Sequence, residues 1–356
     1  MKKTIVFIFI LAITTSCISS NINEVNVYSP SKNIEVNFQL LNGGVPSYFV
    51  SFDGKRIIDT STLGFDFKSI SSLKNNFKIS DVQKNSFNET WTMPWGETKE
   101  VTNNYNEFIV TLTNPKIELS EFKIHFKVYD DGVGFRYEFV KKNGLDSITI
   151  LDENTQFNLT GNHTCWWIPG DWDIYEHLYS KTNFTDIDAL SKVNHNSLAQ
   201  TYIPENAVNT PITMRTEDGT HLSFHEANLT NYSGMTLKID KDNLSMTSEL
   251  VGSDRLGYKA KVQLPFNTPW RTIQITNKAT QLIDSKLIVN LNEPNKLGDI
   301  SWFKPTKYMG IWWEMHLGKS QWSYSTNNKA HGMHGATTEN AKAFIEVQKE
   351  FGSFDK

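Results

Sequence analysis

Cysteine is scarce in this chain. Only Cys17 and Cys165 occur among 356 residues, which excludes a framework of internal disulfides, so stability has to come from a packed core. An excess of positive charge is also missing, because 35 lysines and arginines face 39 aspartates and glutamates. A strongly basic surface for nucleic acid is therefore not expected, and we predict no nucleic-acid partner.

Long hydrophobic runs are nearly absent as well. The one at the N-terminus, Thr4–Ile13, is too short to cross a bilayer as a helix. It follows Lys2 and Lys3, an arrangement typical of a secretory signal peptide, and Cys17 after it resembles the lipid acceptor of a bacterial lipoprotein. We expect residues 1–17 to be a signal peptide with a lipobox. The protein would then be exported across the inner membrane, as a periplasmic protein or an outer-membrane lipoprotein. Its N-terminal lipid would be its only membrane contact. The alternative is plain secretion without a lipid.

Short alternating segments fill the chain from about Val25 to Val289. Apolar and polar residues alternate with a period of two in Ile34–Phe38, Phe108–Leu112, Phe122–Val128 and Thr272–Ile275. This period is the signal of half-buried β-strands, and Asn-Gly and Asp-Gly pairs between the segments suit tight turns. We predict a mostly β fold with one large sandwich of two antiparallel sheets over residues 25–291.

The pattern changes after Asn292. We predict a buried strand over Lys307–Glu314, a loop over Leu317–Ala336 and a helix over Thr338–Phe351, in which Thr338 caps the first turn. This order is typical of the opening unit of an α/β domain. One parallel strand and one helix cannot complete a sheet, so residues 300–356 either dock on the sandwich or begin a domain that is truncated here, and we favour truncation.

Aromatic and acidic residues are concentrated in Cys165–Tyr179, whose sequence is CWWIPGDWDIYEHLY. Aromatic rings beside carboxylates suit a sugar, and carboxylate oxygens also suit Ca²⁺, which needs six to eight ligands. The alternative is a structural loop whose aromatic residues fill the core and whose aspartates cap turns. The pattern alone leaves both possibilities open.

A second cluster follows the predicted strand Lys307–Glu314. It contains Trp312, Trp313, Glu314, His316, Trp322, Tyr324, His331 and His334. Residues just past the first strand of a barrel lie at the rim where barrel active sites form, so Glu314 and His316 are site candidates. A glycosidase needs two carboxylates from different strands, and no zinc-protease, hydrolase-elbow or nucleotide motif is present, so no catalytic residue is assigned.

Several short motifs, taken in order, resemble one family. They are Trp95-Gly96-Glu97, Tyr105-Asn106-Glu107, Tyr129–Tyr137, Asp173–Glu176, Thr210–Arg215, Leu222–Ala227, Thr268–Arg271, Met309–Trp313 and His334–Asn340. Together they are similar to glycoside hydrolase family 97, secreted α-glucosidases and α-galactosidases. The resemblance implies an N-terminal β-super-sandwich of the galactose mutarotase-like type, a catalytic (β/α)₈ barrel of which this chain holds the first β/α unit, and a small C-terminal β domain.

The resemblance also assigns a few residues. Glu176 matches a glutamate that the sandwich contributes to an active-site Ca²⁺, and Trp313 and His316 resemble substrate-facing positions. The family's catalytic carboxylates and other calcium ligands lie on later barrel strands and have no counterpart here, so tight calcium binding by this chain is not expected. In the family, the catalytic carboxylates act either by inversion or by retention of the anomeric configuration.

These observations lead to one expected function and two alternatives. We expect the N-terminal part of a secreted α-glycosidase that hydrolyses terminal α-linked sugars of oligosaccharides, inactive by itself. The sequence leaves open whether this chain is an enzyme at all. A non-catalytic carbohydrate-binding surface lipoprotein is the main alternative, and a β-rich adhesin is the third.

Overall fold

The computed structural model describes residues 23–142, 144–193, 201–304, 308–322 and 333–352. They form two compact units, of which the first holds the described residues up to Trp91 together with Glu100–Pro294. The second holds Thr92–Lys99 and the described residues from Asn295 onward, and each unit is considered by itself. Within the described ranges, no helix has both the length and the apolar character needed to span a membrane.

An eight-stranded antiparallel sheet forms one layer of the first unit. Its order is β1 (Glu24–Tyr28), β2 (Ile34–Leu41), β3 (Val45–Phe52), β4 (Lys55–Thr62), β11 (Gln156–Leu159), β18 (Ser245–Leu250), β17 (Met235–Asp240) and β14 (Ala207–Asn209). The predicted strand Ile34–Phe38 lies within β2 and is confirmed. The predicted turn at Asp53 and Gly54 joins β3 to β4, and both residues have positive φ, 47° and 76°.

A ten-stranded sheet forms the opposite layer. Its order is β13 (Ser180–Asn183), β12 (Thr164–Trp167), β15 (Ile212–Arg215), β16 (His221–Ala227), β21 (Trp270–Thr276), β9 (Gly132–Phe139), β8 (Glu121–Tyr129), β7 (Glu100–Thr113) and β6 (Lys78–Thr92), and β20 (Phe266–Asn267) also pairs with β9. The predicted strands Phe108–Leu112, Phe122–Val128 and Thr272–Ile275 lie in β7, β8 and β21 and are confirmed. A third, three-stranded sheet has the order β19 (Ala260–Gln263), β10 (Ser147–Glu153) and β5 (Phe65–Phe67).

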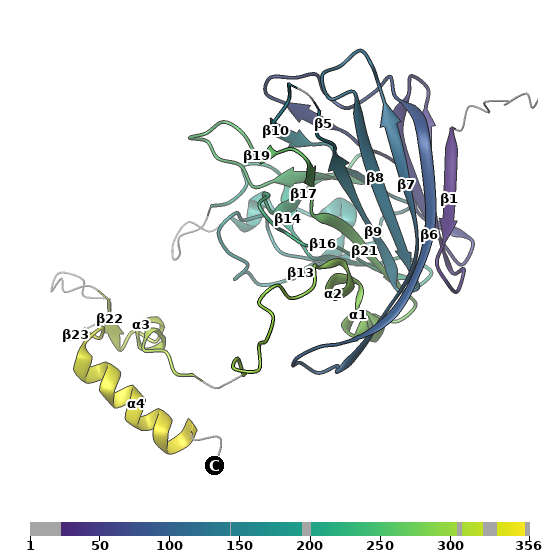
Figure 1. Cartoon of the computed structure of the whole chain (residues 1–356). Helices are drawn as coiled ribbons and strands as arrows, with labels where there is room; N and C mark the ends of the chain where they lie inside the picture. Colours follow the sequence, from purple (N-terminus) through teal and green to yellow (C-terminus); the bar gives the residue numbers. More distant parts are fainter. Residues whose placement is uncertain (1–22, 143, 194–200, 305–307, 323–332, 353–356) are drawn as a thin grey trace, which may run out of the picture. The chain divides into compact units, whose positions relative to one another are not determined.

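Aromatic side chains fill the space between the two large sheets. The ring of Tyr48 in β3 lies 5.8 Å from that of Phe126 in β8 and 4.9 Å from that of Phe135 in β9. Phe38 in β2 adds a further contact with Phe126, at 6.3 Å. All four side chains are buried, so the predicted sandwich of two antiparallel sheets is confirmed (Figure 1).

Short helices cover part of the outer face of the ten-stranded sheet. These are α1 (Ala279–Asp284) and α2 (Leu287–Leu291), which follow β21 and contact it. Two 3₁₀ helices, η1 (Phe184–Asp186) and η2 (Leu190–Lys192), follow β13, and Phe184 of η1 packs in the main core instead. A Cβ atom on Gly134 of β9 would lie 2.5 Å from Leu291 Cδ1. The missing side chain at Gly134 therefore lets α2 pack directly on the sheet.

The second unit differs from the prediction. The strand expected over Lys307–Glu314 is wrong: Tyr308 is exposed, residues 308–311 have no regular structure, and Trp312–His316 form helix α3. Lys307 lies outside the described residues. No described strand pairs with the backbone of this segment, whose hydrogen bonds are local and helical instead, and the described residues contain no (β/α)₈ barrel.

The rest of the second unit is closer to expectation. Helix α4 (Thr338–Gly352) confirms the predicted helix, but Thr337 caps it rather than Thr338, because Asn340 N donates to Thr337 Oγ1 at 3.1 Å. The region predicted as a loop contains a short parallel pair, β22 (Ser320–Gln321) and β23 (Met333–His334).

Candidate functional site

Asp171 organises the loop that follows β12. Its side chain is buried, and Oδ1 accepts hydrogen bonds from the backbone N–H groups of Asp173 at 2.8 Å, Ile174 at 3.2 Å and Thr201 at 3.2 Å. One carboxylate oxygen thus satisfies donors from two separate segments of the chain. The loop is held by a buried acceptor.

The second carboxylate oxygen closes the loop. Asp171 Oδ2 lies 3.2 Å from Nε2 of His177, whose ring contacts that of Tyr202 at 5.4 Å. Asn209 in β14 accepts from Asp171 N at 3.1 Å and donates to the carbonyl of Ile174 at 3.1 Å. These contacts join the loop to the edge of the eight-stranded sheet and fix its course.

The closed loop carries Glu176 at the surface. Glu176 is exposed, and no ion pair within the described ranges includes it. Tyr175 and Tyr179 beside it are each 61% exposed, whereas Trp167 of the same motif is fully buried. The structural reading of the motif therefore holds for Asp171 and Trp167, while Glu176 and the two tyrosines remain available to a ligand.

Glu176 alone does not form a metal site. Across the described ranges, no group of three or more histidine, cysteine, aspartate or glutamate side chains is arranged to hold a metal ion. Calcium needs six to eight oxygen ligands, and a single exposed carboxylate supplies at most two of them. Among the described residues, Glu176 therefore lacks the further carboxylates that a calcium site would normally add.

The second predicted cluster lies in the second unit. Glu314 Oε2 accepts from Ser320 Oγ at 3.2 Å and from Asn340 Nδ2 at 3.0 Å, so this carboxylate links α3 to β22 and α4. Trp313 is 57% exposed, and the ring of Trp312 lies 4.3 Å from that of Trp313 and 5.3 Å from that of His316. Trp313 and His316 thus belong to an aromatic group on α3.

Three of the predicted residues cannot be placed. Cys17, Tyr324 and His331 lie outside the described residues. Glu176 belongs to the first unit, and Trp313 and His316 belong to the second.

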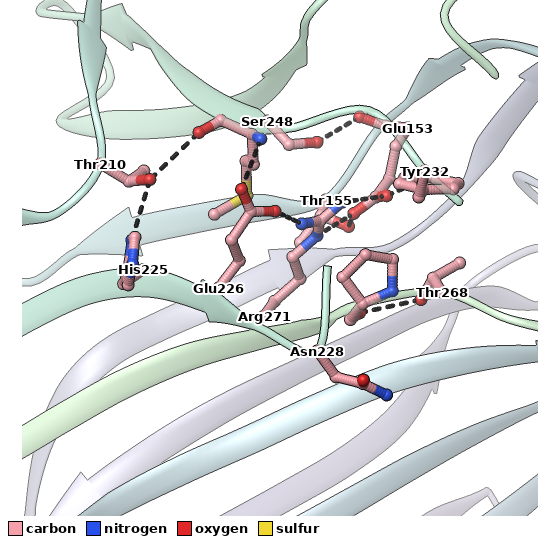
Figure 2. Close-up of polar contacts among 12 residues, drawn as sticks. Glu153, Thr155, Thr210, His225, Glu226, Asn228, Tyr232, Ser248, Thr268 and Arg271 are labelled. Atoms are coloured by element: carbon pink, nitrogen blue, oxygen red, sulfur yellow. Dashed lines mark hydrogen bonds and ion pairs between the residues drawn. The ribbon is translucent and has the colours of Figure 1, made fainter. Parts of the chain in front are cut away.

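A buried arginine network is the feature that sequence reasoning missed (Figure 2). Arg271 in β21 donates through Nε and Nη2 to the two carboxylate oxygens of Glu153, both at 2.7 Å, and through Nη1 to Glu226 Oε2 at 2.6 Å. Tyr232 Oη donates to Glu153 Oε2 at 3.0 Å, and Thr155 Oγ1 donates to Oε1 at 2.8 Å. All the polar groups around the guanidinium are therefore satisfied.

The electrostatics of this network indicate a structural role. Burial would lower the pKa of Arg271, but the carboxylates of Glu153 and Glu226 outweigh it and raise that pKa. Burial raises the pKa of Glu226, against the effect of Arg271. The three residues come from β10, β16 and β21, so the network joins the three-stranded sheet to the ten-stranded sheet. Its carboxylates are enclosed and hydrogen-bonded, whereas a pair of catalytic carboxylates must be open to the sugar that they flank.

Comparison with known proteins gives a consistent result. The family model described as glycosyl-hydrolase 97 N-terminal matches residues 27–294. A glycoside hydrolase family 97 enzyme from Pseudoalteromonas sp. strain K8, solved with acarbose, is 39% identical with a TM-score of 0.78, over 92% of this chain and 46% of that one. A variant of that enzyme has been solved with panose.

More distant relatives extend the comparison. The retaining α-galactosidase of Bacteroides thetaiotaomicron is 23% identical over 332 residues, which is 88% of this chain and 47% of that protein. A β-arabinopyranosidase structure, 18% identical with a TM-score of 0.70, covers 92% of this chain and 49% of its own and shares the fold. The present chain spans about half the length of these relatives.

Proposed function

The chain belongs to glycoside hydrolase family 97, and from this premise we propose that it is the N-terminal part of a secreted α-glycosidase that hydrolyses terminal α-linked sugars of oligosaccharides. The observation that carries the proposal is the loop closed by Asp171, which presents Glu176 between two exposed tyrosines. Rings beside a carboxylate can stack on a sugar and bind its hydroxyl groups.

The relatives support the substrate class. The Pseudoalteromonas enzyme has been solved with acarbose and, as a variant, with panose, so we propose α-linked oligosaccharides as ligands of the present protein too. Trp313 and His316 are proposed as further contacts to the substrate. Export by the segment 1–17 and lipidation at Cys17 complete the proposal, and the lipid would be the protein's only attachment to a membrane.

We propose that catalysis and tight calcium binding require more residues than these 356. The resemblance places the catalytic carboxylates and the other calcium ligands on later barrel strands, so Glu176 would supply one ligand of a shared site. We therefore propose that the 356-residue chain alone is inactive and binds Ca²⁺ weakly.

The test is hydrolysis of p-nitrophenyl α-glucoside and α-galactoside by the purified chain, with and without Ca²⁺, alongside panose binding measured by calorimetry. We expect no turnover. Calcium-stimulated turnover would overturn the proposed inactivity and would mean that the chain completes a catalytic site.

A second candidate function, sugar capture without hydrolysis, is favoured by the exposed Tyr175 and Tyr179. It predicts saturable panose binding that Tyr175→Ala and Tyr179→Ala weaken and that a matched exposed variant, Tyr28→Ala, leaves unchanged. Absence of panose binding would exclude this second function.

A further inference from the structure

Four side chains on the outer face of the ten-stranded sheet form a cation–aromatic cluster: Tyr105 in β7, Lys127 in β8, Arg136 in β9 and Trp270 in β21. Phe126 and Phe135 point into the sandwich core, so their sequence neighbours Lys127 and Arg136 point to the opposite face. Tyr105 and Trp270 belong to a separate small core beneath α2. The cluster therefore lies away from the space between the two large sheets.

Both cations in the cluster pack on aromatic rings. Arg136 Cζ lies 4.4 Å from the centroid of the Trp270 ring, and Lys127 Nζ lies 5.2 Å from the same centroid. Lys127 Nζ also lies 4.2 Å from the ring of Tyr105. The Trp270 ring is itself buried, so it brings two positive charges toward one place on the sheet.

Neither cation forms an ion pair with another described residue. The ion pairs and hydrogen bonds of the described residues include neither Lys127 nor the side chain of Arg136, and Arg136 Nε is enclosed with nothing to donate to. Glu138, the nearest acid on β9, already accepts from His125 at 2.7 Å and from Lys123 at 3.2 Å. Glu107, which lies opposite Lys127 in the pairing of β7 with β8, accepts from Asn85 Nδ2 at 3.2 Å. Glu107 and Glu293 raise the pKa of both cations through their charge, but no ion pair of the described residues joins either acid to Lys127 or Arg136.

Partly buried cations without an ion pair are unusual on the surface of a folded protein. Loss of hydration lowers the pKa of Lys127 and of Arg136, so their positive charge is held at a cost. Charges that lose water are normally paired with an opposite charge, and stacking on a ring satisfies none of the N–H donors of a guanidinium. A partner outside the described residues would supply what is missing.

The geometry points to an oxyanion-binding site at Lys127 and Arg136. The flat fork of a guanidinium fits the two oxygens of a carboxylate, phosphate or sulfate, and a lysine ammonium beside it adds a second charge-assisted hydrogen bond. No hydrogen bond among the described residues uses the terminal nitrogens of Arg136, and only its Nε is enclosed, so an anion can reach the terminal nitrogens. Trp270 and Tyr105 form the apolar floor that holds both cations in place.

The test uses the 356-residue chain and three inorganic or small organic anions. Phosphate, sulfate and acetate are titrated into the protein at constant ionic strength with chloride as the counter-titrant, and binding is followed by calorimetry and by the thermal midpoint of unfolding. We expect saturable binding and a rise in the midpoint, since an anion that binds only the folded state stabilises it. Preference for phosphate or sulfate indicates a free tetrahedral anion as occupant, and preference for acetate indicates a protein carboxylate.

Variants separate the site from a general effect of charge or salt. Arg136→Gln and Lys127→Gln should each weaken anion binding by roughly tenfold or more, because each removes charge-assisted hydrogen bonds. Lys123→Gln is the matched control, since it removes a cation from the same face of β8 whose charge is already paired with Glu138. It should bind anions like the unaltered protein.

Two results would overturn the inference. One is the absence of saturable binding of all three anions to the unaltered chain, a measurement that does not depend on whether any variant folds. The other is an equal response of Lys123→Gln and Lys127→Gln to phosphate and sulfate, which would reduce the effect to general salting and leave the cluster as a structural stack.

Discussion

Asp171 Oδ2 and His177 Nε2 lie 3.2 Å apart and close a seven-residue loop in which Glu176 is the residue before the histidine. The aspartate is fully enclosed, whereas the glutamate is open to solvent. A buried pair thus fixes the backbone from which an exposed carboxylate projects. The position of Glu176 therefore depends on the contact between Asp171 and His177.

Asp171→Ala should destabilise the protein by about 2–4 kcal/mol, because three backbone N–H groups and His177 lose their acceptor and each enclosed donor without a partner costs about 1–3 kcal/mol. Denaturant unfolding followed by fluorescence measures the loss. Glu176→Gln is the control and should change stability by less than about 0.5 kcal/mol, since this side chain is exposed. Equal effects of the two substitutions would show that Asp171 does not hold the loop.

Arg271→Met should destabilise the fold by about 3–5 kcal/mol, because Glu153 and Glu226 would be left buried without a counter-charge. The comparison is Lys55→Met, which breaks an ion pair whose lysine is 70% exposed and should cost no more than about 1 kcal/mol. Equilibrium unfolding in urea at neutral pH gives both values. A similar small loss for the two variants would contradict the structural role of the arginine network.

Gly134→Ala should destabilise the protein by about 1–3 kcal/mol, because the new Cβ would lie 2.5 Å from Leu291 Cδ1. Adding Leu291→Ala should recover part of this loss, since the shorter side chain removes the clash. A double-mutant cycle of unfolding free energies measures the coupling. Strictly additive effects would mean that α2 does not pack on β9 as described.

Cys165 should resist thiol reagents in the folded protein. The side chain is buried, and burial raises the pKa of its thiol to about 12, so at pH 8 only about one molecule in ten thousand carries the reactive thiolate. In a Cys17→Ser variant, Ellman's reagent should label the native chain slowly and the guanidinium-unfolded chain at once. Fast labelling of the native chain at pH 8 would contradict the buried placement.

The same thiol makes a prediction about alkaline stability. The unfolded thiol ionises near pH 9 and the folded one near pH 12, so the folded state retains its proton over this interval. The stabilising contribution of the protonated thiol is complete below pH 9 and declines as the pH rises toward 12. Unfolding free energies measured from pH 8 to pH 11 should therefore fall less steeply for Cys165→Ala than for the unaltered chain.

Much of the sandwich could be predicted from the sequence because strand burial has a period of two. Phe122–Val128 alternates in the sequence and alternates in the structure, with Phe122, Phe126 and Val128 in the core. The turn at Asp53 and Gly54 could be predicted equally well, from the Asp-Gly pair itself. These signals are local, so no knowledge of distant partners is needed.

Other features depend on contacts that no local pattern encodes. Arg271 and Glu153 are 118 positions apart, so neither residue signals the other in the sequence. Trp312–Glu314 was predicted as the end of a strand and instead begins helix α3, because a strand also needs a neighbour to pair with. At the candidate site, Glu176 was identified through the family resemblance, whereas the part played by Asp171 became visible only from its hydrogen bonds.

One edge of the ten-stranded sheet has a consequence for the protein's behaviour in solution. β6 is the outermost strand on that side, and most of its fifteen residues are exposed. A long outermost strand leaves backbone donors and acceptors open to another chain, which is the route by which sheets grow into fibrils. Here Lys78, Asp81, Lys84 and Glu89 place charges of both signs along it. Pairing with a strand of another chain would remove water from these charges, which is costly. The charges therefore protect this exposed edge against aggregation.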